Sequence, residues 1–196
     1  MFEAAVISAV ANVATAVFTL GAVIVAAVGL NTWKSELKGR ADFDTARVLA
    51  KDTYALREAL GSYRTPMYSS AEFPDGDMRS AEGYAAMFQA RWRPLSAALT
   101  KYDLSVLEAE ALWGRSIRER ADRLERCVIT VFVATDSFVE DKRTTGRNFE
   151  AAPEFGQRTR AEVAGSRDSD TNAMSAEIRA AVKEIEDFLK PHLSRK

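Results

Sequence analysis

The stretch that decides the architecture is Ala4–Leu30, AAVISAVANVATAVFTLGAVIVAAVGL, which contains no charged side chain. A helix of this length reaches about 40 Å at 1.5 Å per residue, and the hydrocarbon core of a bilayer is about 30 Å thick. The sequence therefore predicts a transmembrane anchor over residues 1–32, with the membrane span at about 4–30. A second domain, mostly helical, is predicted over residues 33–196.

This stretch allows two other interpretations. A cleaved signal peptide needs a basic start and an apolar run of about 7–15 residues. Here the first basic residue is Lys34, Glu3 precedes the run, and the run is about twice that length. A buried helix of a soluble protein is the other alternative, but a helix that is uncharged on every face is hard to cover in a chain of 196 residues. The membrane anchor is the prediction that fits best.

The residues after the predicted span indicate its orientation. Lys34, Lys38 and Arg40 follow the span against the single acid Glu36, and no basic side chain precedes it. Because an excess of Lys and Arg stays on the cytoplasmic side, the N-terminus is expected outside and the large C-terminal domain in the cytoplasm. Trp33 lies where the aromatic belt of that interface is expected.

Small residues recur along one face of the predicted span. Ser8, Asn12 and Ala16 are four residues apart and share a face with Ala4. Small faces let helices approach closely, and a buried asparagine amide gains a hydrogen bond from a partner helix. The sequence thus predicts a homo-oligomer through Ser8, Asn12 and Ala16. The alternative is that alanine is simply common in membrane spans and that Asn12 reaches the outer interface.

Composition excludes several function classes. The 27 Lys and Arg side chains are matched by 28 Asp and Glu, with the two signs interspersed. A nucleic-acid partner is therefore not expected, because such proteins carry a basic stripe. The single cysteine, Cys127, cannot form an internal disulfide, which fits a reducing cytoplasm. It begins the apolar run Cys127–Ala134, which favours a buried core thiol over a nucleophile.

Four stretches beyond the span show the helical spacing of three and four residues between apolar positions, and none alternates as a strand does. These stripes are Ala46, Leu49, Thr53, Leu56, Leu60 and Tyr63; Ala81, Tyr84, Phe88, Arg91, Leu95, Ala98 and Tyr102; Ile117, Ala121, Leu124, Val128, Val131, Thr135 and Phe138; and Ile178, Val182, Ile185 and Leu189. The predicted fold class is all-α, with the transmembrane helix followed by an antiparallel bundle of about four helices.

Prolines and glycines predict where these helices end. Arg64-Thr65-Pro66 should end the first one, since the residue before a proline disfavours the helical region. Pro94 predicts a kink or restart near Trp92, and Trp113-Gly114 predicts a break. Residues 144–171 lack strong periodicity and are expected to form an irregular arm, or one that contains a short helix near 157–163.

The third stripe has a charged outer face. Arg115 and Glu119, Glu119 and Arg123, and Asp122 and Arg126 are each four residues apart. Such pairs contribute a few tenths of a kcal/mol each. We therefore expect a solvent-exposed row of ion pairs along one helix.

No motif for catalysis or metal binding is complete. Asp168-x-Asp170-x-Asn172 resembles the start of a calcium loop, but the sixth and twelfth positions hold Ala173 and Arg179 instead of Gly and Glu. A helix N-terminus explains these polar residues better. His192 is the only histidine and is expected to be solvated. We expect no catalytic, cofactor-binding or metal residue, and no cofactor.

The triplet Arg91-Trp92-Arg93 mixes basic and aromatic side chains, as proteins that bind single-stranded nucleic acid do. One such triplet on a helix is more typical of a packed tryptophan between two solvated arginines. That structural interpretation is the expectation.

One segment carries a family resemblance. Trp33-Lys34, Leu37-Lys38-Gly39, Phe43, Ala46-Arg47 and Leu49, followed by Arg57 and Arg64-Thr65-Pro66, resemble a group of uncharacterised bacterial single-pass membrane proteins. Residues 108–114 form a second, vaguer block of similarity. The resemblance implies a bacterial or phage origin, hence the bacterial inner membrane, and an N-terminal anchor with a cytoplasmic helical domain. It implies no activity and assigns no functional residue.

The sequence as a whole predicts a membrane-tethered helical interaction or scaffold protein that is not an enzyme. Its expected partners are the lipid bilayer, a second copy and another protein. Three alternatives stay open: a membrane-anchored regulator or sensor whose 144–171 arm or 64–77 loop receives a signal, an oligomeric pore or lysis protein, and an unrecognised enzyme.

Overall fold

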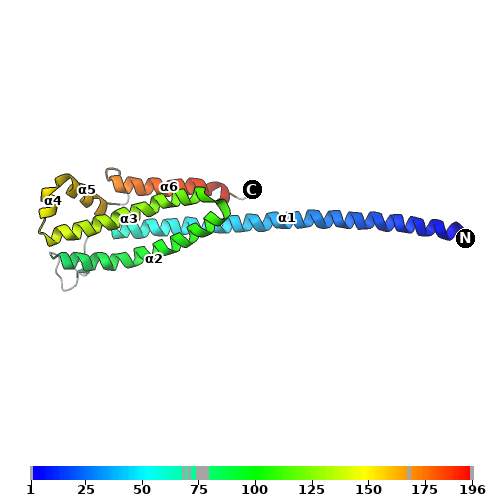
Figure 1. The fold of residues 1–196 in the computed structure, drawn as a ribbon, viewed down its shortest axis with the longest axis horizontal. Helices are drawn as coiled ribbons and strands as arrows, with labels where there is room; N and C mark the ends of the chain where they lie inside the picture. The colour runs from blue at the N-terminus through cyan, green and yellow to red at the C-terminus, as the bar shows by residue number, and fades with distance from the viewer. Residues whose placement is uncertain (1, 68, 70–71, 74–79, 167–168, 195–196) are drawn as a thin grey trace. The chain divides into compact units, whose positions relative to one another are not determined.

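The computed structural model describes residues 2–67, 69, 72–73, 80–166 and 169–194, with the side chains of 2–17, 22, 24 and 27 left aside. All regular structure in these residues is helical, which confirms the all-α prediction (Figure 1). The helices are α1 (Phe2–Tyr63), α2 (Ala81–Trp113), α3 (Arg115–Arg143), α4 (Arg147–Ala151), α5 (Pro153–Val163) and α6 (Ala173–Leu193). The chain divides into two compact units, Met1–Asp44 and Thr45–Lys196.

The first unit consists of the N-terminal part of α1. Many of its described large apolar side chains are exposed: Phe18, Leu20, Val23, Val25, Val28, Leu30, Trp33 and Leu37. Among the described residues, no helix has a segment apolar and long enough for a membrane crossing. The predicted contact residues Ser8, Asn12 and Ala16 lie outside the described side chains.

The second unit is a helical bundle whose core consists of the predicted stripes. In α3 every stripe residue is buried except Phe138, which is partly buried and packs on the core. The stripes of α6 and of residues 46–63 of α1 are buried throughout. Trp92 of α2 packs on Phe132 of α3, and Tyr84 packs on Phe138, so the two helices run antiparallel (Figure 1).

Glycine permits the sharp turn between α2 and α3. Gly114 has a φ of 74°, a conformation that side-chain-bearing residues rarely adopt, and its N–H donates to the carbonyl of Glu110. The predicted break at Trp113-Gly114 is therefore confirmed. The predicted end of the first helix is confirmed too, because α1 ends at Tyr63.

The structure corrects one of the alternatives predicted at each of two places in the bundle. α2 does not restart near Trp92 but continues through Pro94. Pro94 and Ala90 both lie on the exposed face, so water can reach the Ala90 carbonyl that proline leaves without a helical partner. The segment 144–171, expected to be irregular, contains α4 and α5, and the alternative of a short helix near 157–163 is confirmed.

The structure also corrects the row of ion pairs predicted along α3. Arg115 pairs with Glu119 at 3.2 Å as predicted. Arg123, however, reaches across to α6, where it donates to both carboxylate oxygens of Glu177 at 2.7 and 3.0 Å and also pairs with Glu184. Among the described residues the predicted pairs Glu119–Arg123 and Asp122–Arg126 do not form. Arg123 pairs instead with two carboxylates of α6, which packs beside α3, and Asp122 pairs with Arg118 at 2.7 Å.

Candidate interaction surface

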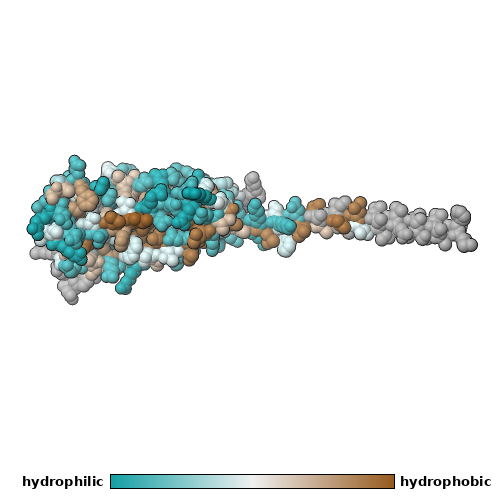
Figure 2. Space-filling model, in the orientation of Figure 1, coloured by the Kyte–Doolittle hydropathy of each residue, from teal (hydrophilic) through white to brown (hydrophobic). Residues whose placement is uncertain are grey.

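An apolar surface interrupts the charged outer face of α3. Ile129, Phe132 and Val133 are 53%, 47% and 56% exposed, although they lie in the middle of a helix whose inner face forms the core. The residues are spaced three and four apart, so they form one continuous patch. Apolar residues gather over the bundle on the visible face in Figure 2. We call Ile129, Phe132 and Val133 the α3 patch.

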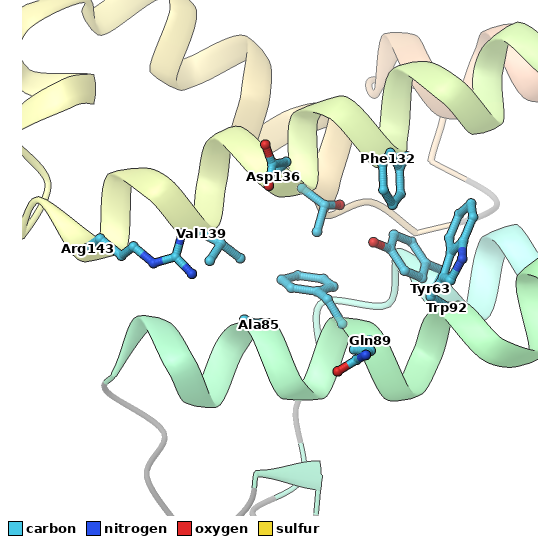
Figure 3. Close-up of a pocket in the computed structure, with 10 residues that line it drawn as sticks. Tyr63, Ala85, Gln89, Trp92, Phe132, Asp136, Val139 and Arg143 are labelled. Carbon is cyan, nitrogen blue, oxygen red and sulfur yellow. The ribbon is translucent and has the colours of Figure 1, made fainter.

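A shallow groove between α2 and α3 adjoins the patch. It has a volume of about 180 Å³ and is lined by Tyr63, Ala85, Phe88, Gln89, Trp92, Phe132, Thr135, Asp136, Val139 and Arg143. The two helices supply opposite walls, and Tyr63 enters from the end of α1 (Figure 3). Trp92 and Phe132 stand against each other with ring centroids 4.7 Å apart. Phe132 therefore belongs to both the patch and the groove.

The rim of the groove is polar. Arg143 extends along α3 toward Val139 and pairs with Glu140 at 3.0 Å and with Glu82 of α2 at 3.7 Å (Figure 3). Nearby carboxylates raise the pKa of the Arg143 guanidinium, with the hydrogen bond that it donates to Glu140 as the main cause. Asp136 is exposed. An aromatic groove with a charged rim suits binding of an apolar side chain.

A buried arginine holds the other side of the bundle together. Arg64, only 1% exposed, follows α1 directly. Its guanidinium donates to the carbonyls of Glu162 (2.7 Å) and Ala161 (3.1 Å) at the end of α5. It also donates to Oδ1 of Asn172 (3.0 Å) and Oγ of Ser175 (3.1 Å) at the start of α6. Burial lowers the pKa of Arg64 to about 10, so the side chain stays a cation at neutral pH.

Gly165 lets the backbone come this close to Arg64. The Gly165 N–H donates to the Arg64 carbonyl at 3.1 Å. A Cβ on Gly165 would lie 2.8 Å from Nη2 of Arg64 and 2.9 Å from Nδ2 of Asn172. We name Arg64 with its four acceptors the Arg64 clamp. It is a structural centre, because its guanidinium donates four hydrogen bonds to acceptors of the chain itself.

The structure places the remaining residues that the sequence singled out. Asn172 is the N-cap of α6 and accepts from the Ser175 N–H at 2.9 Å, which confirms the helix-start interpretation. Asp170 pairs with Arg179, and Asp168 lies outside the described residues. His192 is partly buried and stacks on Trp113 with centroids 4.3 Å apart, so the prediction of a solvated histidine was wrong.

The triplet Arg91-Trp92-Arg93 is structural, although not in the expected way. Trp92 packs in the bundle as predicted, but Arg91 is not solvated. Its guanidinium donates to the carbonyls of Thr65 (3.0 Å) and Met67 (2.9 Å) and pairs with Glu72 at 2.6 Å. Arg91 thus fixes the chain that connects α1 to α2.

Cys127 is buried, as predicted, and burial raises the pKa of its thiol to about 11. At pH 8 only about 0.1% of the thiol is therefore the reactive thiolate. We expect a thiol reagent to modify the native chain at least about a hundredfold more slowly than the urea-unfolded chain, followed by absorbance at pH 8. The matched control is Thr130→Cys, an exposed position on the same helix, which should react at once. Equal rates at the two positions would contradict the burial of Cys127.

Sequence reasoning missed the α3 patch. Ile129, Phe132 and Val133 lie within the run Cys127–Ala134, which is apolar except for Thr130. The spacing of the core stripe could nevertheless have indicated the patch. The stripe runs through Val128 and Val131, and Ile129 and Val133 fall outside its spacing.

Comparison with protein-family models, with curated proteins and with solved structures gave no match in any of the three. The geometry of the chain itself therefore carries the functional argument.

Proposed function

We propose that this chain is a membrane-tethered helical interaction protein without catalytic activity. The helical domain, residues 33–196, presents a binding surface, and residues 1–32 hold it at a membrane. The observation that carries the interaction role is the α3 patch beside its aromatic groove. Half-exposed Ile, Phe and Val side chains grouped on one helix are typical of a surface that binds another protein.

The tether is supported by the sequence. Ala4–Leu30 is uncharged, and Lys34, Lys38 and Arg40 follow it. We propose a single span in a bacterial inner membrane with the N-terminus outside and the helical domain in the cytoplasm. The span would also contact its counterpart in a second copy through Ser8, Asn12 and Ala16.

We expect the full chain, expressed in bacteria, to stay in the membrane pellet after extraction at alkaline pH. Replacing Val13 and Val17 with lysine should release most of it, because each central charge costs about 2.5–3.5 kcal/mol in a span. The control carries lysine at the exposed positions Thr130 and Thr100 and should stay in the pellet. Full release of the unaltered chain would contradict the tether.

The orientation has its own measurement. A reporter fused after Lys196 that works only in the cytoplasm should be active, and a reporter that works only in the periplasm should be silent. The opposite pattern would overturn the proposed orientation and leave the tether itself standing.

A further inference from the structure

The outer face of α3 has a symmetry that a second copy of the chain can use. Ile129 and Val133 each lie two residues from Val131, in opposite directions, and Arg126 and Asp136 each lie five residues from it. These four residues follow one another at spacings of three, four and three, so they share one face. Val131 points into the core, and the face opposite it is exposed.

An antiparallel α3 of a second copy, related by a two-fold axis over Val131, meets this face with matched partners. Ile129 then lies opposite Val133 of the second copy, and Arg126 lies opposite Asp136. Because a two-fold contact repeats every pair, the two copies would share two Ile–Val contacts and two Arg–Asp pairs. The face has a base, Arg126, before the two apolar residues and an acid, Asp136, after them. Two copies of such a face place opposite charges together only when the helices run antiparallel.

The two charged residues of this face are free to pair with a second copy. Arg126 and Asp136 are exposed, and neither forms an ion pair within the described part of the chain. Most other arginines of α3, by contrast, are committed: Arg115, Arg118, Arg123 and Arg143 all have carboxylate partners. Arg126 and Asp136 are thus among the α3 charges that form no ion pair within the described part of the chain, and the antiparallel arrangement brings these two together.

One pair in the arrangement is unfavourable, and the structure limits its cost. Asp122 and Glu140 each lie nine residues from Val131 and would face each other as like charges. Each already pairs with an arginine of its own helix, Asp122 with Arg118 at 2.7 Å and Glu140 with Arg143 at 3.0 Å. Packed helices also cross at an angle and diverge away from the crossing point, so the central four residues carry the contact.

We propose that the α3 patch, together with Arg126 and Asp136, binds the same surface of a second copy in an antiparallel two-fold dimer. The proposal specifies the partner within the proposed function and rests on it. The patch is smaller than a standard interface, so association in solution is weak. Confinement in a membrane would raise the local concentration and populate the dimer.

Disulfide trapping in the full chain tests the register. In the antiparallel dimer Ile129→Cys of one copy lies opposite Val133→Cys of the other, within the range of about 4.4–6.8 Å between Cα atoms that a disulfide needs. In a dimer of two copies of the same variant, the two cysteines are offset along the helix axis by four residues, or about 6 Å, compared with the mixed pair. An equal mixture of the two variants in membrane vesicles with a mild oxidant should therefore cross-link at least about fivefold faster than either variant alone.

The control for trapping is the unaltered chain, whose only cysteine, Cys127, is buried and should give no cross-link. Fastest cross-linking by Ile129→Cys alone would indicate a parallel contact and overturn the proposal. Equal, slow cross-linking in every sample would overturn it as well.

Charge reversal tests the pairing. Arg126→Asp places two acids opposite each other in the dimer, and Asp136→Arg places two bases there. When a tagged copy of either variant is purified, we expect about tenfold less of the untagged copy of the same variant to co-purify with it than for the unaltered chain. A tagged copy of one variant mixed with an untagged copy of the other restores both opposite-charge pairs. The amount of untagged copy that co-purifies should then return to within about twofold of the amount for the unaltered chain. Helix content by circular dichroism should be the same in all samples, since both positions are exposed.

These measurements separate the α3 contact from the wider function. If copies associate equally whatever stands at positions 126 and 136, and Asn12→Leu abolishes association, the contact lies in the span and the α3 proposal is wrong. The membrane interaction role would then still stand. If the chain is released from membranes yet the mixed cysteine variants cross-link fastest, the α3 dimer is supported and the tether is wrong.

Discussion

Leu124→Asp should unfold the helical bundle. Leu124 is fully buried in the centre of α3, and the described core around it is apolar. An aspartate there is an uncompensated buried charge, or a buried protonated acid, and it also removes the packing of a leucine. The cost is about 4 kcal/mol or more, a large share of the stability of a domain of this size. The measurement is urea unfolding of the full chain, followed by tryptophan fluorescence, because Trp92 and Trp113 pack against the core.

The matched control for Leu124→Asp introduces the same residue on the same helix at an exposed position. Thr130→Asp should change the free energy of unfolding by less than about 0.5 kcal/mol. Equal stability of the two variants would show that the stripe of α3 is not core. Arg123→Ala, by contrast, is not a neutral control, because Arg123 holds two carboxylates of α6.

The elements that the sequence predicted well are those whose residues depend on near neighbours. The stripe Ile117–Phe138 has a long, regular spacing, and burying it fixes both the helix and its inward face. Helix ends with Gly114 or with Arg64-Thr65-Pro66 follow from local backbone restrictions. Burial of Cys127 follows from the same stripe.

The elements that the sequence missed depend on residues far apart in the chain. α5 buries Gly156, Thr159 and Val163, which are too small or too polar to produce an apolar stripe. Arg64 precedes Thr65-Pro66 and looks like a loop residue, yet its acceptors lie roughly a hundred residues later. Spacing within one segment cannot reveal such pairings.

The candidate surface was hidden for another reason. The stripe through Val128 and Val131 predicts the inward face, but a run that is apolar except for Thr130 gives no sign that Ile129 and Val133 stay exposed. Only the arrangement of the neighbouring helices leaves that face of α3 exposed. Arg126 belongs to the predicted solvated face of α3, and only in the structure is it evident that Arg126 and Asp136 flank an apolar patch.

Arg64→Met should destabilise the bundle strongly, although methionine keeps most of the volume. Removing the guanidinium leaves the carbonyls of Glu162 and Ala161 and the amide oxygen of Asn172 without these donors. A hydrogen bond to a charged group contributes about 1.5–3 kcal/mol, and the Ala161 carbonyl and Asn172 Oδ1 keep other donors, so we expect a loss of about 3 kcal/mol in urea unfolding. Arg64→Lys should lose less, because its ammonium retains the charge and three donors. Arg47→Met, an exposed arginine of α1, is the matched control and should have almost no effect. If Arg64→Met were as stable as Arg47→Met, the Arg64 clamp would not hold α5 and α6 to the end of α1.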